Sequence, residues 1–162
     1  MTTTMTTTNN YDPSGQWRGA GMEMYHELNT NKFYKIKFNV IMTITKVDKN
    51  IYRVKSSFRY KNSGDIMGFR YTKNEISSTE DNLVHKDDNV LLSSSLWLDS
   101  DSLSRTLDRY RLSEDGKHLD YSYNVNNVYN PLIPKFLKSL YSVFNKKAGR
   151  ISVAGNFKLQ KI

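Results

Sequence analysis

The feature that most constrains the fold is a regular alternation of apolar and polar residues over 33–44 and again over 51–60. A period of two places alternate side chains on opposite faces of a β-strand. The intervening residues 47–50, Val-Asp-Lys-Asn, are rich in turn formers. The pattern therefore predicts a long antiparallel hairpin with one buried and one solvated face. The buried face would carry Tyr34, Ile36, Phe38, Val40, Met42, Ile44, Tyr52, Val54, Phe58 and Tyr60.

Similar runs predict strands along most of the remaining chain. We expect them over 16–28, 66–73, 90–98, 103–112, 118–125 and 151–159, with a short strand at 83–85 inside the irregular segment 76–88. Gly19 and Gly21 share a face with Trp17, which indicates a bend, a bulge or a close approach of another backbone. Asp115-Gly116 predicts a hairpin turn, because glycine reaches positive φ without steric cost.

Two segments depart from this pattern. Residues 1–10, Met-Thr-Thr-Thr-Met-Thr-Thr-Thr-Asn-Asn, have no charge and no periodic apolar residue, which predicts a disordered tail. From Pro134 the apolar spacing is that of an amphipathic helix near 134–147. Residues 11–162 are expected to form one domain.

A sheet of about nine strands, each with one apolar face, must form a sandwich or close on itself. Sequential hairpins, long strands and the glycines of the first strand favour closure. We therefore expect an all-β, mainly antiparallel fold, in which an up-and-down meander closes into a barrel of about eight to ten strands with one late α-helix. A barrel of this size is filled by side chains or holds one small ligand.

Composition restricts function only broadly. The chain has no cysteine, which excludes disulfides and thiolate metal sites. It has no apolar run of the ~20 residues that cross a bilayer and no signal-peptide pattern, so a soluble intracellular protein is expected. The net charge of +8 suits acidic partners, although a bias towards lysine and asparagine codons gives the same excess.

No catalytic or metal-binding motif is readable. The histidines, His26, His85 and His118, have no metal-ligand spacing. The carboxylates Asp12, Glu23, Asp108 and Asp120 could pair only by accident of folding. There is no Gly-flanked nucleophile elbow and no Gly-rich phosphate loop. We expect a non-enzymatic protein without a cofactor.

The solvated face of the hairpin is basic. It carries Lys35, Lys37, Arg53, Lys55 and Arg59. Neighbouring positive charges repel one another, so this face suits a bound anion, or it is a solvated outer wall that discourages edge pairing. Base stacking needs exposed aromatic rings, and those of the hairpin are predicted on the other face, so nucleic-acid recognition is not favoured.

Gly15-Gln16-Trp17, at the head of the first strand, resembles the Gly-x-Trp motif that opens the barrel in lipocalins. The order of barrel, helix and strand is also similar to theirs, and avidins and fatty-acid-binding proteins share the general pattern. The resemblance implies that Trp17 closes the narrow end of the barrel, covered by Arg109, Arg111 or Arg150. The chain departs from the family in lacking the Thr-Asp-Tyr turn, cysteines and a secretion signal, which argues against a secreted carrier.

Tyrosines on the inward faces indicate an interior that is partly polar, because a buried hydroxyl needs a hydrogen-bond partner. Such an interior suits a ligand cavity, although core packing explains each tyrosine as well. An inward Arg70, Arg105 or Arg109 would select a carboxylate or phosphate group. The predicted ligand-binding residues are Trp17, Tyr34, Phe38, Tyr52, Phe58, Arg109, Tyr121 and Tyr123.

Two hypotheses follow. In the first, the barrel binds a small, mostly apolar or amphipathic molecule, with or without an anionic group. In the second, a filled barrel is a structural or assembly module that docks an acidic protein or nucleic acid through its basic face or late helix. The sequence specifies neither the ligand nor the oligomeric state.

Overall fold

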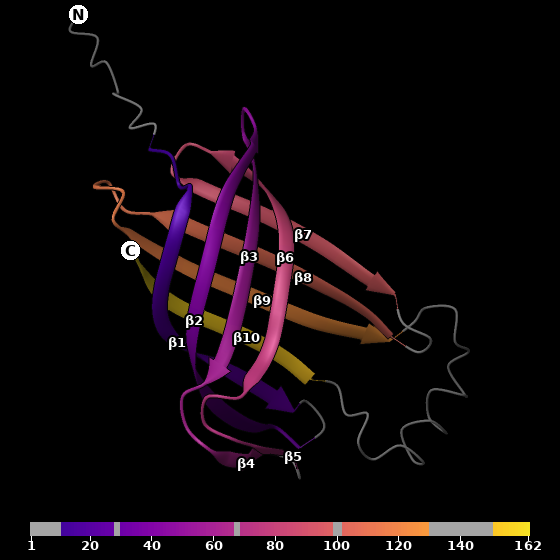
Figure 1. Cartoon of the computed structure of the whole chain (residues 1–162). Coiled ribbons are helices and arrows are strands. Elements are labelled where there is room, and N and C mark those ends of the chain that lie inside the picture. The colour runs from indigo at the N-terminus through magenta and orange to yellow at the C-terminus, as the bar shows by residue number, and fades with distance from the viewer. Residues whose placement is uncertain (1–10, 28–29, 67–68, 99–101, 130–150) are drawn as a thin grey trace, which may run out of the picture.

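The computed structural model describes residues 11–27, 30–66, 69–98, 102–129 and 151–162, which form an antiparallel all-β barrel (Figure 1). Eight strands close a ring in the order β1-β10-β9-β8-β7-β6-β3-β2. Their bounds are β1 Gly15–Glu27, β2 Lys32–Asp48, β3 Ile51–Tyr60, β6 Ile76–Asp87, β7 Val90–Leu98, β8 Ser102–Leu112, β9 His118–Tyr129 and β10 Ile151–Lys161. The barrel predicted from the sequence is confirmed. The predicted tail over 1–10 and helix near 134–147 lie outside the described residues.

Strands β1 and β10 close the barrel, and two glycines permit it. The register runs from Trp17 opposite Lys161 to Glu27 opposite Ile151. A Cβ atom placed on Gly19 would lie 1.9 Å from a backbone oxygen of β10, and one on Gly21 would lie 2.0 Å from another. No side chain fits at those distances, so glycine is needed at both positions. The expected close approach of a second backbone is confirmed.

The interior is a packed aromatic and aliphatic core. Alternate residues of β2 and β3 point inward, so the predicted hairpin and its buried face are confirmed, apart from Tyr34, which is half-buried. Phe38 and Phe58 meet edge to face at 6.3 Å between ring centroids, and Tyr121 stacks on Tyr110 at 4.4 Å. Each fully buried aromatic of this kind contributes roughly 1.5–3 kcal/mol through removal of its surface from water.

The Asp115-Gly116 turn forms as predicted between β8 and β9. Gly116 has a φ of 66°, in the left-handed region that glycine adopts at least cost. The Asp115 carboxylate accepts a hydrogen bond of 3.0 Å from the backbone N–H of Lys117, which fixes the turn.

Two expectations about the middle of the chain were wrong. The strand expected over 66–73 is divided between β4 (Gly64–Ile66) and β5 (Phe69–Tyr71), which pair with each other outside the ring. Tyr71 packs on Tyr60 at 4.7 Å between ring centroids, so this hairpin covers the core instead of extending the wall. The short strand expected at 83–85 is instead the twelve-residue β6. Its inward residues before Val84 are polar, so it lacks the alternation that marks a strand.

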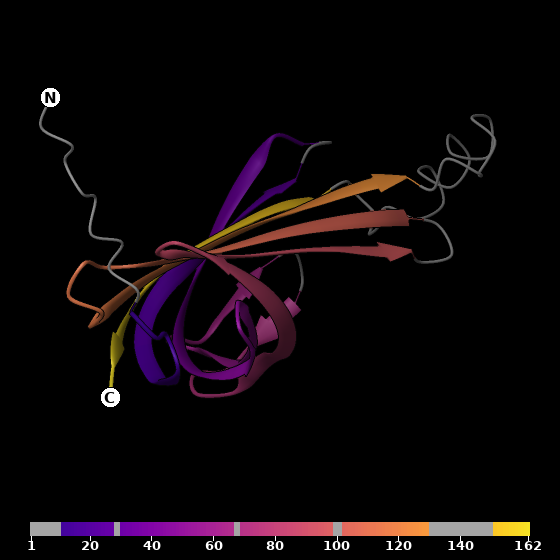
Figure 2. The same ribbon diagram turned by 90° about the horizontal axis from the view of Figure 1, so that it is seen from above.

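The barrel wall is split between β6 and β7. Among the described residues these strands pair only from His85 to Asp87, opposite Val90 to Leu92. Figure 1 shows β6 and β7 meeting at one end and then diverging, and Figure 2 shows β7, β8 and β9 running away from the curled β2, β3 and β6. The separation leaves a seam in the wall between Ile76–Asn82 of β6 and Ser93–Leu98 of β7.

Candidate binding site at the seam between β6 and β7

A cavity of about 200 Å³ lies at the seam. It is lined from β6, β7 and β8 by Thr79, Glu80, Asn82, Ser95, Thr106 and Asp108, with Asp81 at its outer rim. Strand alternation explains this lining, because Asp108 has the same parity as the buried Tyr110 and Leu112. The cavity is polar, and none of the described residues that line it is basic.

Two carboxyl groups meet the hydroxyl of Tyr121 at this cavity. Tyr121 donates to Asp108 Oδ1 at 2.9 Å, and its oxygen lies 3.4 Å from Glu80 Oε2. A tyrosine hydroxyl has one proton to donate, so the longer contact is best satisfied when Glu80 carries a proton and donates it. Burial, followed by the charge of Asp108, raises the pKa of Glu80 to about 7. Burial also raises the pKa of Asp108, although the Tyr121 hydrogen bond opposes this effect.

A third carboxyl group lies further along the interior. Glu23 of β1 is buried and accepts hydrogen bonds from the hydroxyls of Tyr25 and Tyr123. Burial raises the pKa of Glu23 despite these two bonds. The charge of Glu23 adds to the rise in the pKa of Glu80, so the acids of the interior influence one another.

Two buried hydroxyls beside Glu80 lack partners. Ser56 Oγ, directly opposite Glu80 in the β3–β6 pairing, makes no hydrogen bond with the described residues, and neither does Tyr110 Oη. Ser56 is 5% exposed and Tyr110 is 0% exposed. Burial, and then the charges of Asp108 and Glu80, raise the pKa of Tyr110, which is the next inward residue after Asp108 on β8. An unpaired buried polar group costs about 1–3 kcal/mol, so a bound molecule that reached either hydroxyl would recover part of that cost.

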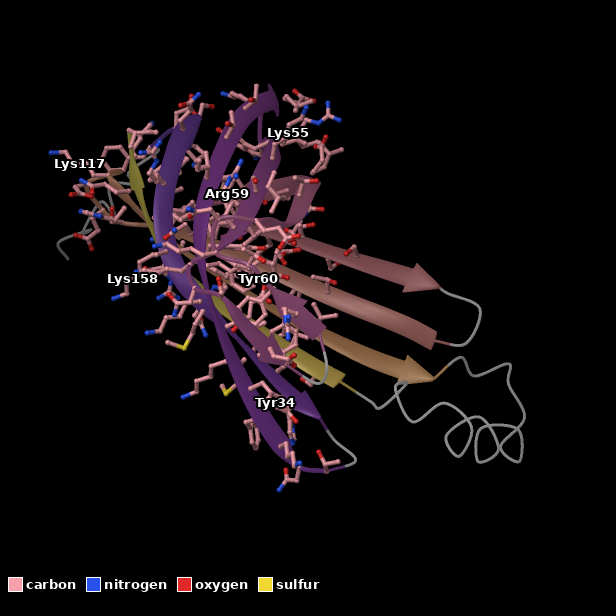
Figure 3. All side chains as sticks on the ribbon, turned by 60° about the horizontal axis from the view of Figure 1, so that its bottom comes forward. Tyr34, Lys55, Arg59, Tyr60, Lys117 and Lys158 are labelled. Carbon is pink, nitrogen blue, oxygen red and sulfur yellow. The ribbon has the colours of Figure 1, made fainter. Side chains whose placement is uncertain are left out.

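Most of the residues predicted to bind a ligand do face inward, but they are not all in one place. Phe58 and Tyr121 pack together in the middle of the barrel at 6.3 Å between ring centroids, with Phe38 and Tyr123 beside them. Trp17 lies at one end and is completely buried. Figure 3 shows Tyr34 near the other end of β2, away from Lys55 and Arg59.

Tyr52 lies at the Trp17 end of the barrel, where it is also buried. Burial, with a smaller contribution from the nearby Asp12, raises the pKa of Tyr52. The seam cavity therefore lies beside Tyr121, but the predicted ligand-binding residues as a set do not surround it.

The expectation of an inward Arg109 was wrong. Arg109 and Arg111 alternate with the buried Asp108 and Tyr110 and are exposed on the outer wall of β8. Arg70 is exposed as well, and nothing is described of the side chains of Arg105 and Arg150.

The cation over Trp17 is Lys161. Its Nζ lies 5.6 Å from the centroid of the Trp17 ring, within reach of a cation–π interaction. The indole N–H of Trp17 donates to the carbonyl oxygen of Pro13 at 2.9 Å. The expectation that tryptophan closes this end fits its complete burial, but neither Arg109 nor Arg111 covers it.

The basic face of the hairpin is exposed as expected and partly neutralised. Arg53 Nε lies 2.8 Å from Asp81 Oδ1, and Lys55 Nζ lies 3.8 Å from Asp81 Oδ2. Arg59 donates to the carbonyl oxygen of Asn74 at 3.1 Å. The repulsion expected on this face is therefore relieved within the chain. Lys35 and Lys37 are also exposed, on the neighbouring strand.

A second groove crosses the outer wall of β1, β8, β9 and β10. It has a volume of about 500 Å³ and is lined by Arg109, Arg111 and Lys158, with Asp120 between them in the strand register. No described carboxylate comes within 4.0 Å of these three cations. Figure 3 shows Lys158 on a different side of the barrel from Lys55.

Glu80, Ser56, Tyr110 and Thr106 were missed in the sequence. The parity of β8 could have located Thr106, Asp108 and Tyr110, because they share a face with Leu112. Glu80 had no such signal, since the segment around it has no apolar alternation.

No protein-family model matches this chain, and no curated protein matches it in sequence. Among solved structures the chain is similar to the crystal structure of Rv2717c from M. tuberculosis. That similarity has a TM-score of 0.45 and 12% identity, covering 93% of this chain and 94% of the other. A likeness of this degree indicates nothing about function.

No group of three or more His, Asp or Glu side chains suited to a metal ion occurs among the described residues. The described residues contain no helix long and apolar enough to span a membrane.

Proposed function

We propose that this protein is a non-enzymatic, lipocalin-like binding protein that takes a small amphipathic molecule through the β6–β7 seam. The observation that carries this proposal is the seam cavity, where the wall pairing stops and Glu80 and Asp108 line an opening. Two buried hydroxyls, next to these acids in the strands, lack partners among the described residues. The other neighbouring strands of the ring pair over most of their length, so the seam is a place where a small molecule could reach the interior.

The acidic lining of the cavity argues against the anionic ligand group that the sequence left open. An anionic group was possible while Arg109 was expected inside the barrel. The cavity instead carries Glu80 and Asp108, with Glu23 further in, and these would repel an anion. A volume of about 200 Å³ is smaller than the roughly 300–1,000 Å³ of typical ligand sites, so it suits a small head group.

The test is native mass spectrometry of the protein isolated from its source, compared with Thr106→Phe expressed in the same cells. Thr106 lines the cavity and phenylalanine would fill it. The wild type should retain a small molecule that Thr106→Phe loses. Leu107→Phe is the matched control, because the neighbouring Leu107 points outward and is 45% exposed. Ser95→Leu fills the cavity from β7 if Thr106→Phe unfolds. A wild type without a retained mass, or folded cavity-filled variants that keep it, would refute the proposal.

A second candidate function is the docking of a polyanion on the outer wall. The groove with Arg109, Arg111 and Lys158 favours it, because these cations have no described carboxylate partner. Fluorescence anisotropy with a labelled oligothymidylate and with polyglutamate would test it. Arg109→Ala/Arg111→Ala should weaken binding and flatten its salt dependence, since fewer counterions are released. Equal binding by this variant and the wild type would exclude the groove.

A further inference from the structure

The two carboxyl groups of the seam have more acceptor sites than the Tyr121 hydroxyl can fill. Tyr121 donates its one proton to Asp108 at 2.9 Å, so an ionised Glu80, whose Oε2 lies 3.4 Å from the Tyr121 oxygen, receives no hydrogen bond from that hydroxyl. Each carboxylate has about four acceptor sites when it is ionised. None of the described residues lining the cavity is an arginine or lysine that could satisfy them. A molecule that brings several donors would therefore fit between the two ionised carboxyl groups better than one that brings acceptors.

The two unpartnered hydroxyls independently indicate a ligand. Ser56 of β3 lies directly opposite Glu80 in the strand register and is buried, and Tyr110 is the next inward residue after Asp108 on β8. Asn82 and Tyr121 lie beside the Tyr110 hydroxyl, but neither forms a hydrogen bond of normal geometry with it. A hydroxyl can accept one N–H donor while the carboxylates accept others. A cationic donor between Glu80 and Asp108 would therefore have acceptors on more than one strand.

Other ligand head groups fit less well. An anion would face Glu80 and Asp108 without a cation among the cavity lining. A metal ion would need a set of ligands that the described residues do not provide. An alcohol would supply a single proton, which leaves acceptors of both carboxyl groups unpaired. A protonated primary amine supplies three N–H donors and a positive charge.

We propose that the seam cavity binds a small primary ammonium group between Glu80 and Asp108, with Ser56 and Tyr110 as further hydrogen-bond partners. This inference rests on the proposed binding function and names the chemistry of the ligand head group. The rest of the ligand would extend from the cavity along the apolar interior or out through the seam.

Isothermal titration calorimetry with three probes of similar shape tests the proposal. The probes are phenethylamine, 2-phenylethanol and phenylacetate, which carry a cationic, a neutral and an anionic head group. The amine should bind at least about tenfold more tightly than the alcohol, since charged hydrogen bonds are the stronger ones. Phenylacetate should bind more weakly than either. An alcohol or acetate that binds as tightly as the amine would overturn the inference.

Two substitutions test whether Glu80 and Asp108 cause the preference for the amine. Glu80→Gln and Asp108→Asn should each weaken phenethylamine binding about tenfold and change 2-phenylethanol binding far less. Glu114→Gln, at an exposed carboxylate in the β8–β9 turn, removes the same charge and should leave both affinities unchanged. Unchanged amine binding by folded Glu80→Gln and Asp108→Asn would also refute the assignment.

The dependence of affinity on pH provides a separate readout. An ammonium group favours ionised Glu80, so amine affinity should rise as the pH rises through about 7, and Glu80→Gln should abolish that rise. The titratable groups that face Glu80 are Asp108 and Tyr110 of β8, Tyr121 and Tyr123 of β9, and Glu23 of β1. A flat affinity in the wild type across this range would contradict a role for Glu80.

The experiment separates this inference from the proposed function. If 2-phenylethanol binds as well as the amine and Thr106→Phe abolishes both, the seam binds small molecules and only the ammonium assignment fails. If none of the probes binds while native mass spectrometry finds a retained molecule, the assignment again fails alone. If no probe binds and no molecule is retained, both fail.

Discussion

Replacing Glu80 by glutamine should stabilise the protein, and the gain should depend on pH. The pKa of Glu80 rises from an ordinary 4.5 to about 7, so the folded protein favours the protonated carboxyl. Protonated Glu80 contributes its full stability below pH 4.5, the ordinary pKa of a glutamate. That contribution is lost as the pH rises through about 7. At 1.36 kcal/mol for each pH unit, the carboxylate costs about 3 kcal/mol above that pH. Glutamine avoids that cost and has an amide N–H that can donate to the Tyr121 oxygen.

Urea unfolding followed by tryptophan fluorescence measures this difference. Below pH 4.5, Glu80→Gln and the wild type should have similar free energies of unfolding. Above pH 7, Glu80→Gln should be more stable by up to about 3 kcal/mol. Glu114→Gln, with the same change of net charge at an exposed site, should remain within about 0.5 kcal/mol of the wild type at every pH. Parallel stability curves for Glu80→Gln and the wild type would show that Glu80 is not destabilised by burial.

Three further substitutions test the rest of the architecture. Tyr121→Phe removes the donor to Asp108 and should cost about 1–3 kcal/mol in urea unfolding, with a larger loss at high pH because the Asp108 pKa rises further. Gly21→Ala places a Cβ 2.0 Å from a backbone oxygen of β10, so hydrogen exchange should show β10 losing protection; unchanged protection would contradict the closure. Asp81→Asn breaks exposed ion pairs only, so it should leave the urea midpoint nearly unchanged while heparin retention increases.

The sequence predicted the wall of the barrel well because local patterns specify it. The alternation in β2 and β3 determines which side chains are buried, and Gly19 and Gly21 mark the point where another backbone approaches. The location of the site was harder to predict. Glu80 lies in a strand whose inward residues are polar, so the same feature that forms the cavity removes the apolar alternation that identifies strands.

Arg109 shows a different limit of sequence reasoning. Its inward or outward direction depends on one residue of register, and the arginines of β8 alternate with Asp108 and Tyr110. Arg109 was placed inside because the register was open and because the lipocalin resemblance implied an arginine over Trp17, whereas parity with the buried Leu112 places Asp108 inside. A cation does lie over Trp17, but it is Lys161 from β10, and no local pattern predicts such a long-range contact.

The closure of β1 on β10 has a consequence for the nascent chain. β2 is available to pair with β1 soon after synthesis, whereas β10 emerges only after every other described strand. Until then one edge of β1 exposes its N–H and C=O groups, and Gly19 and Gly21 have no side chain to shield them. A chain that stalls before residue 151 therefore presents a template on which a neighbouring polypeptide can add a strand. Exchange of β10 between two chains would give a swapped dimer by the same pairing.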